Sequence, residues 1–89
     1  MRIDYKNGDY YLGEVSNNKY HGVGLYFSKE NGTYEGEWVN GRAEGEGIGI
    51  DAFGNKYLGR FKHDAKHGYG VENYANGDIY KGDFVKDEK

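Results

Sequence analysis

The 89-residue sequence contains no cysteine and no proline, and each absence excludes a class of protein. Without cysteine the chain can form no disulfide scaffold, no cysteine zinc site and no thiol nucleophile. Without proline it is neither a proline-rich linker nor a collagen. The longest apolar run, Leu25-Tyr26-Phe27, is far shorter than the ~20 residues of a membrane-spanning helix, and the first residues do not resemble a signal peptide. We therefore expect a cytoplasmic protein, with a peripheral position at a membrane or the cytoskeleton as the alternative.

Aliphatic residues and basic clusters are also scarce. Leu, Ile, Val and Phe together supply 16 of the 89 residues, and the 12 Lys and Arg residues are scattered over a chain whose net charge is -3. An acidic chain without a basic cluster does not favour nucleic acid, and it counts against an anionic membrane surface. The chain instead has 16 glycines and 10 tyrosines, so aromatic rings must provide much of the apolar surface.

A 23-residue repeat runs through the whole chain. Its first landmark is an aromatic residue, followed two places later by glycine and four places later by a large apolar residue. Its second landmark is Gly-x-Gly, and its third is an adjacent Asn and Gly ahead of each tyrosine. The tyrosines are Tyr11, Tyr34, Tyr57 and Tyr80, and the Gly-x-Gly pairs begin at Gly22, Gly45 and Gly68. We expect one array over residues 1–89, with repeats starting near 8, 31, 54 and 77 and the last repeat truncated.

Each repeat has the pattern of two strands joined by tight turns. Asn-Gly favours a type I′ hairpin turn, because both central residues need a positive φ. Helices are not expected, since glycine costs ~1 kcal/mol in a helix and no stretch of 12 residues avoids it. The turn candidates are Asn7-Gly8, Asn17-Asn18, Asn31-Gly32, Asn40-Gly41, Gly54-Asn55, His63-Asp64 and Asn76-Gly77. The sequence predicts an all-β antiparallel meander of about eight strands.

The Asn40-Gly41 turn predicts the register of one hairpin. Centred there, it places Trp38 opposite Ala43, and the other opposed pairs are Gly36 with Gly45 and Tyr34 with Gly47. Alternate residues share one face, so the aromatic rings lie over glycines of the partner strand. The same count places Tyr11 over Gly24 and Tyr57 over Gly70. The opposite face carries Leu12, Glu14, Glu35, Glu37, Leu58 and Arg60, joined by Leu25, Phe27, Ile48, Ile50 and Val71 unless the second turn contains a bulge.

Residues 32–47, GTYEGEWVNGRAEGEG, resemble a MORN repeat (membrane occupation and recognition nexus), and the resemblance extends over the whole chain. The departures are Val15 in place of Trp or Phe, Asn18 in place of the turn glycine, and Asp64-Ala65 in place of Gly-Lys. The resemblance implies a single-layer, twisted sheet that curls into an elongated trough. It also implies a non-catalytic module that acts in protein interaction, dimerisation or scaffolding, and several members of the family bind a protein segment in the trough.

The periodic aromatic residues are the candidate partner-binding groove. Their structural interpretation is that they cover glycines, because a one-layer sheet has no second layer to supply a core. Their functional interpretation is a groove that binds a partner through apolar ring surface, since large apolar patches mark binding sites and Tyr and Trp are common interface anchors. The stripe consists of Tyr11, Tyr34, Trp38, Tyr57, Phe61, Tyr80 and Phe84. We take Tyr34, Trp38, Tyr57 and Phe61 as the contact residues because they lie in the middle of the array.

Four carboxylates form a second candidate surface around the second hairpin: Glu35, Glu37, Glu44 and Glu46. Two interpretations stay open, a solvated acidic face and a patch for a basic partner. The predicted register opposes Glu37 and Glu44, a like-charge pair that would mildly destabilise the hairpin.

Catalytic, metal and nucleotide sites are not expected. His21, Glu44 and His67 share one repeat position, but repeats two strands apart are separated by nearly 10 Å, too far to share a zinc ion bound at ~2.1 Å. The Gly-x-Gly pairs are not followed by a helix, which a nucleotide loop requires. The hydroxyls of Ser16, Ser28 and Thr33 have no supporting histidine at matching positions. We therefore expect no enzyme, no cofactor and no metal.

The sequence predicts a non-enzymatic interaction or scaffold module that holds a segment of another protein in an aromatic groove. The alternatives are a membrane-surface module for phospholipid head groups, a self-assembling structural element, and a small acidic inhibitor of another protein. Self-assembly would use the edge strands at residues 2–6 and 79–85, whose backbone groups invite strand addition. The charged residues Arg2, Asp4, Lys6 and those of the tail 86–89 would guard these edges.

Overall fold

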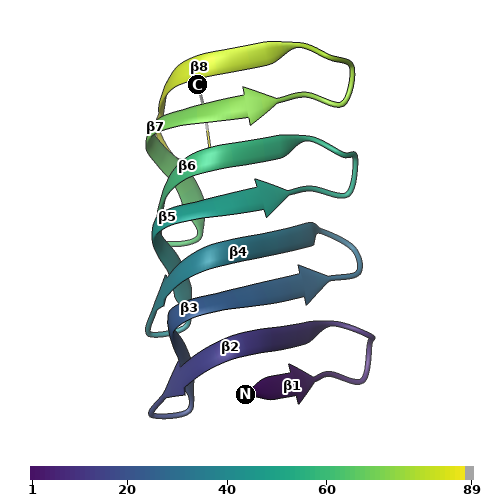
Figure 1. Cartoon of the computed structure of the whole chain (residues 1–89), viewed down its shortest axis with the longest axis vertical. Helices are drawn as coiled ribbons and strands as arrows, with labels where there is room; N and C mark the ends of the chain where they lie inside the picture. Colours follow the sequence, from purple (N-terminus) through teal and green to yellow (C-terminus); the bar gives the residue numbers. More distant parts are fainter. Residues whose placement is uncertain (88–89) are drawn as a thin grey trace.

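The computed structural model describes residues 1–87, which form eight strands and no helix. The strands pair antiparallel in sequence order in one open sheet (Figure 1). This arrangement confirms the predicted all-β meander. The strands are β1 (Arg2–Asp4), β2 (Tyr10–Ser16), β3 (Lys19–Ser28), β4 (Gly32–Val39), β5 (Arg42–Ile50), β6 (Lys56–Lys62), β7 (Ala65–Asn73) and β8 (Ile79–Phe84).

A bulge shifts the register within each of three hairpins, β2–β3, β4–β5 and β6–β7. Trp38 pairs with Ala43 as predicted, but the predicted pairs of Gly36 with Gly45 and Tyr34 with Gly47 are wrong. The observed partners are Gly47 for Gly36 and Gly49 for Tyr34. Between the pairs of Gly36 with Gly47 and Trp38 with Ala43 lie one unpaired β4 residue, Glu37, and three unpaired β5 residues, 44–46, so every pair beyond the bulge moves by two. The same shift recurs between β2 and β3 and between β6 and β7.

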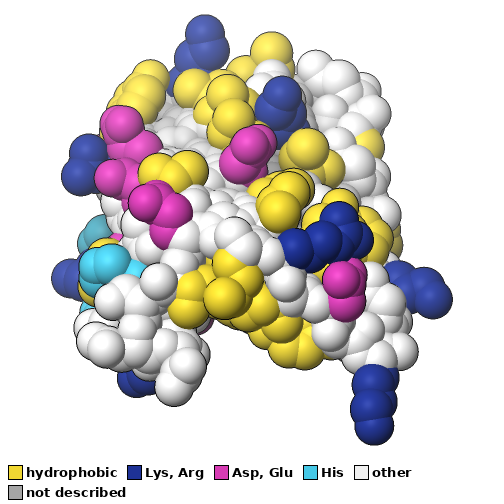
Figure 2. Space-filling view, turned by 60° about the horizontal axis from the view of Figure 1, so that its bottom comes forward, with side chains coloured by type: hydrophobic (Ala, Val, Ile, Leu, Met, Phe, Trp, Pro, Cys, Tyr) yellow, Lys and Arg dark blue, Asp and Glu magenta, His cyan; other side chains and the backbone are white. Residues whose placement is uncertain are grey.

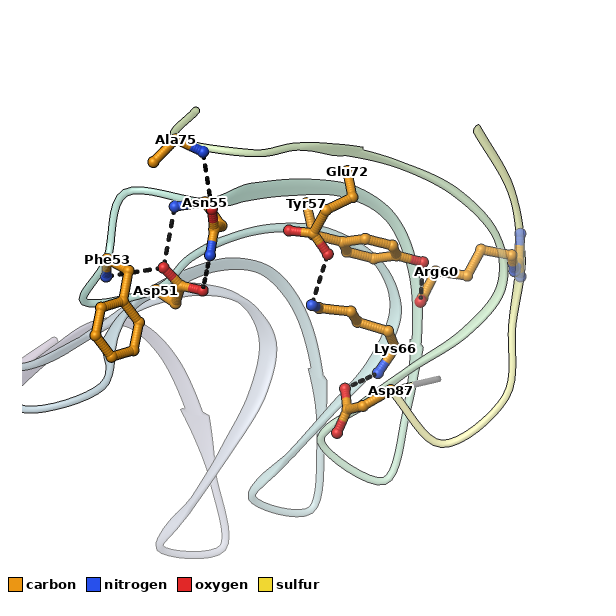
Figure 3. Close-up of polar contacts among 9 residues, drawn as sticks. All are labelled: Asp51, Phe53, Asn55, Tyr57, Arg60, Lys66, Glu72, Ala75 and Asp87. Carbon is orange, nitrogen blue, oxygen red and sulfur yellow. Dashed lines mark hydrogen bonds and ion pairs between the residues drawn. The ribbon is translucent and has the colours of Figure 1, made fainter. Parts of the chain in front are cut away.

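Facing glycines mark the line along which the sheet curves. The pairs are Gly13 with Gly24, Gly36 with Gly47 and Gly59 with Gly70. A Cβ atom on Gly13 would lie 2.4 Å from the Gly24 Cα atom, so only glycine permits this approach. Beside this line the ribbon turns sharply and makes a trough, which Figure 3 shows with Tyr57, Lys66 and Glu72 on the inner side and Arg60 on the outer side.

The tight turns lie along one long side of the trough (Figure 1). Asn17-Asn18, Asn40-Gly41 and His63-Asp64 each have two successive residues with positive φ, between 50° and 85°, as a type I′ turn requires. Asn18 and Asp64 thus keep the geometry although glycine is the usual residue there. Along the opposite side the chain turns at the other four predicted places, where Gly8, Gly32, Gly54 and Gly77 adopt positive φ. The adjacent asparagines do not, so the type I′ geometry predicted for Asn-Gly is wrong at these four turns.

The core is a row of interlocking rings on the concave face. Tyr11, Trp38, Tyr57 and Phe84 are buried. Neighbouring rings meet edge to face with centroids about 5 Å apart, as between Tyr34 and Phe61 at 4.7 Å and between Tyr57 and Phe84 at 5.0 Å. Edge-to-face contact suits the quadrupoles of aromatic rings.

The glycine-covering prediction is confirmed. A Cβ atom on Gly24, Gly47 or Gly70 would lie 2.2–2.4 Å from a tyrosine hydroxyl oxygen. The rings responsible belong to Tyr11, Tyr34 and Tyr57 respectively. Because of the bulge, each ring covers a glycine diagonal to it rather than the residue directly opposite.

The convex face carries the second set of apolar residues. The register places Leu12 beside Leu25, Ile48 beside Leu58 and Leu58 beside Val71. This confirms the predicted placement of Leu25, Phe27, Ile48, Ile50 and Val71 opposite the tyrosines. The bulges do occur, but each one moves the pairing by two residues, an even number that keeps every side chain on its face. Leu12 and Ile50 are 46% and 40% exposed. On the face drawn in Figure 2, hydrophobic side chains alternate with acidic and basic ones.

Candidate functional site

A groove of about 230 Å³ opens on the concave face in the middle of the array. The four mid-array aromatics, Tyr34, Trp38, Tyr57 and Phe61, all line it. The rest of the lining comes from strands β4, β5 and β7 and from the turns and loops beside them: Asn31, Thr33, Ala43, Gly49, Ile50, Asp51, Asn55, Asp64, Lys66, Glu72 and Asp87. We name this hollow the central groove.

The central groove exists because the second repeat has small residues where its neighbours have large ones. Two inward-facing positions decide this, and in the second repeat they hold Ala43 and Gly49. The equivalent residues of the first repeat are Tyr20 and Tyr26, and those of the third are Lys66 and Glu72. The groove is therefore flanked by an aromatic pair on one side and an ion pair on the other.

The ion pair is the most buried charged contact among residues 1–87. The Lys66 Nζ atom lies 2.6 Å from the Glu72 Oε1 atom, and the two side chains are 27% and 4% exposed. The Lys66 ammonium also lies 5.5 Å from the centre of the Tyr57 ring (Figure 3). The positions that all repeats share do not include these residues, so the repeat pattern did not predict them. Comparing the three repeats at positions 43 and 49 and their equivalents, where the residues differ in size and charge, would have identified them.

Carboxylates from the loops complete the lining. Asp51 accepts hydrogen bonds from the Asn55 side chain at 2.9 Å and from the Phe53 amide at 2.9 Å. Partial burial alone would raise the pKa of Asp51, but these bonds outweigh it and hold the pKa below its usual value. Asp51 is therefore ionised at neutral pH.

Two further aspartates fasten one hairpin to the next. The Asp64 Oδ1 atom accepts the Ala43 amide at 2.7 Å. The Asp87 Oδ1 atom accepts the Lys66 amide at 2.8 Å, the bond drawn in Figure 3. Both aspartates occupy the second position of a tight turn. The equivalent residue of the second hairpin is Gly41, which has no side chain to accept such a hydrogen bond. Their carboxylates thereby reach the central groove.

The aromatic stripe divides into buried and partly accessible rings. Tyr11, Tyr57 and Phe84 are at most 2% exposed, and the 6% exposed Trp38 donates its Nε1 hydrogen to the Gly24 carbonyl at 3.0 Å. These four residues hold the sheet together, so alanine variants would measure stability as much as contact. Tyr34, Phe61 and Tyr80 are partly exposed.

The four glutamates of the acidic cluster make different local contacts. The predicted opposition of Glu37 and Glu44 is wrong because the bulge separates them: Glu37 accepts the Glu46 amide at 2.6 Å, whereas Glu44 accepts the His63 amide at 3.1 Å. Glu46 approaches Arg60 at 3.9 Å. Glu35 lies on the convex face beside Leu25 and Ile48.

The histidine column and the edges serve local contacts. His21 Nδ1 accepts the Asn40 amide at 3.4 Å, just as Glu44 accepts the equivalent His63 amide. Residues 1–87 contain no group of three His, Cys, Asp or Glu side chains placed to hold a metal ion. At the first edge Arg2 pairs with Asp4 at 3.1 Å. Of the charged tail, residues 88–89 lie outside the described part.

Comparison with protein-family models finds MORN repeats at residues 11–33, 34–48 and 57–79, which together make up more than half of the chain. The chain belongs to the MORN-repeat family. The matched segments carry the tyrosine, glycine and bulge geometry described above, and MORN repeats are generally non-catalytic modules of membrane or protein interaction. No curated protein matches the chain. Residues 1–87 include no helix that could span a membrane.

Proposed function

We propose that this MORN array is a non-enzymatic module that binds a segment of another protein in its central groove. The observation that carries the proposal is the groove itself, an uncovered hollow whose floor is formed by Tyr34, Trp38, Tyr57 and Phe61. Aromatic rings in a concave site bury much apolar area at little conformational cost. The alternating strands of a stiff sheet would hold these rings in place before a partner arrives.

The groove lining favours protein over phospholipid as the ligand. Asp51, Asp64, Glu72 and Asp87 contribute carboxylates, and Lys66, the basic residue of the lining, is already paired with Glu72. A phosphate head group would meet like charge there. A polypeptide can supply apolar and basic side chains together.

The test fills the groove with side chains that the first repeat already carries at the equivalent positions. Random peptides displayed on phage are selected on the wild-type protein, and the enriched peptides are then measured on Ala43→Tyr, which copies Tyr20 of the first repeat. We expect at least ~10-fold weaker binding to this variant. A second variant, Gly49→Tyr, copies Tyr26, and urea unfolding checks that both variants fold.

Two outcomes would overturn the proposal. One is that no peptide is enriched, and the other is that the enriched peptides bind both folded variants as tightly as wild type. Flotation with vesicles containing phosphoinositide at low salt serves as the parallel measurement. Vesicle binding that the two variants abolish would assign the groove to lipid instead.

A further inference from the structure

The three complete repeats cover the inner face of their tyrosine in different ways. In the first repeat the Tyr20 ring stacks on Tyr11, with centroids 3.9 Å apart and planes 9° apart. In the third repeat the Lys66 ammonium lies over Tyr57. In the second repeat the equivalent residue is Ala43, which has only a methyl group to offer Tyr34.

The exposure of the three tyrosines follows this difference. Tyr11 is 0% exposed and Tyr57 is 1% exposed, whereas Tyr34 is partly exposed and lines the central groove. The ring that the fold leaves uncovered therefore lies in the middle of the proposed binding site.

Lys66 shows that a cation can occupy the position over the inner face of the repeat's tyrosine. Its Nζ atom lies 5.5 Å from the centre of Tyr57 and 5.9 Å from the centre of Phe84, two rings that meet edge to face at 5.0 Å. One repeat earlier the equivalent rings are Tyr34 and Phe61, which meet edge to face at 4.7 Å. A cation over such ring faces is favoured by their quadrupoles.

The charges around the second-repeat position also suit a cation. Glu72 neutralises Lys66, and the carboxylates of Asp51, Asp64 and Asp87 remain in the lining of the same groove. The low pKa of Asp51 keeps its charge in place at neutral pH.

We infer that the open face of Tyr34 is a subsite for an arginine or lysine side chain of the bound protein segment. The side chain would occupy the space above Ala43 and Gly49, as Lys66 occupies the equivalent space in the third repeat. This inference rests on the proposed function and names the chemistry of the partner.

The test uses the peptides selected on the wild-type protein as probes. Each arginine or lysine of a groove-binding peptide is replaced by glutamine in turn. We expect one replacement per peptide to weaken binding ~10-fold. The same peptide should also lose binding to Ala43→Lys/Gly49→Glu, which copies the ion pair of the third repeat and fills the subsite with the protein's own cation.

A matched control separates the subsite from net charge. Leu12→Lys adds one positive charge on the convex face, where Leu12 is 46% exposed, and should leave peptide binding within ~2-fold of wild type. Groove-binding peptides that tolerate every replacement by glutamine would overturn the inference while the proposed function stands. The absence of any groove-binding peptide would overturn both.

Discussion

A tyrosine hydroxyl in each repeat donates a hydrogen bond to a carbonyl three residues further along its own strand. The acceptors are the carbonyl oxygens of Glu14, Glu37, Arg60 and Asp83, at 2.6–3.0 Å from the hydroxyl oxygens of Tyr11, Tyr34, Tyr57 and Tyr80. To reach that carbonyl the ring must lie flat along the strand, and glycine two places after the tyrosine leaves room for it. The Tyr-x-Gly motif is therefore a structural unit in every repeat, whatever the partner.

Close packing against the end of β5 requires glycine at position 32. Its φ is +98°, and a Cβ atom there would lie 1.8 Å from the Ile50 carbonyl oxygen. The loop between β3 and β4 has three residues, whereas the equivalent loops have five. The shorter loop brings the glycine one place later in the repeat and against the end of β5.

We predict that Gly32→Ala lowers the free energy of unfolding by at least ~2 kcal/mol, because it adds a backbone clash to the strain of positive φ. Gly77→Ala is the matched control, since Gly77 has the same φ of +98° and a Cβ atom there would have nothing within 4 Å, and it should cost ~1 kcal/mol. Urea denaturation of both variants measures the difference. Equal losses would show that the clash with Ile50 is relieved at no cost.

At the scale of the elements, most of the strand order was predictable and the exact register was not. Asn40-Gly41 located its turn because positive φ is a local property that Asn and Gly both tolerate. The bulge opposite Glu37 depends instead on the approach of Gly36 and Gly47 and on a carboxylate accepting the Glu46 amide. Such contacts join residues of different strands. Counting residues outward from the turn therefore cannot predict them.

The aromatic floor of the groove and its position in the middle of the array were predictable, but the hollow above that floor was not. The 23-residue period placed Tyr34, Trp38, Tyr57 and Phe61 on one face in the middle of the array. Burial of Trp38 and Tyr57 follows from packing across repeats, which a single repeat does not reveal. The hollow itself follows from Ala43, a departure from its neighbours rather than a shared feature.

The paired charges of the third repeat yield a prediction at this scale. Lys66→Ala leaves the 3% exposed Glu72 without its cation, and we expect a loss of ~3 kcal/mol of unfolding free energy, because a lone buried carboxylate is costly. Adding Glu72→Ala should recover at least ~1 kcal/mol. Urea denaturation of the two single variants and the double variant gives the coupling energy. A double variant less stable than Lys66→Ala would contradict the buried ion pair as the source of the loss.

At the scale of the whole molecule, the protein is a layer one sheet thick, with extents of 37 × 23 × 15 Å. Its strands contact their sequence neighbours (Figure 1), so the folded state depends on local hairpins and on the continuous row of rings. Phenol groups take part in every repeat of that row. The stability of the whole array should therefore be sensitive to the ionisation of tyrosine.

Alkaline pH tests this dependence. Burial, followed by the charge of Glu37, raises the pKa of Tyr34 to about 12, and burial likewise raises the pKa of Tyr11, Tyr20 and Tyr57. In the unfolded chain a phenol titrates near ~10, so above that pH the unfolded state loses protons first. The stability that the protonated tyrosines contribute is fully present below pH ~10 and is lost as the pH rises toward 12.

We expect the free energy of unfolding, measured by urea denaturation, to fall steadily above pH ~10 and the phenolate absorbance of the folded protein to rise late, at the unfolding transition. Tyr34→Phe isolates one contribution from the titration of lysines: it should be less stable than wild type at neutral pH, because the bond to the Glu37 carbonyl is lost, yet its stability should fall less steeply above pH ~10. If wild type and Tyr34→Phe lose stability with the same slope, the ring row is not what couples the fold to alkaline pH.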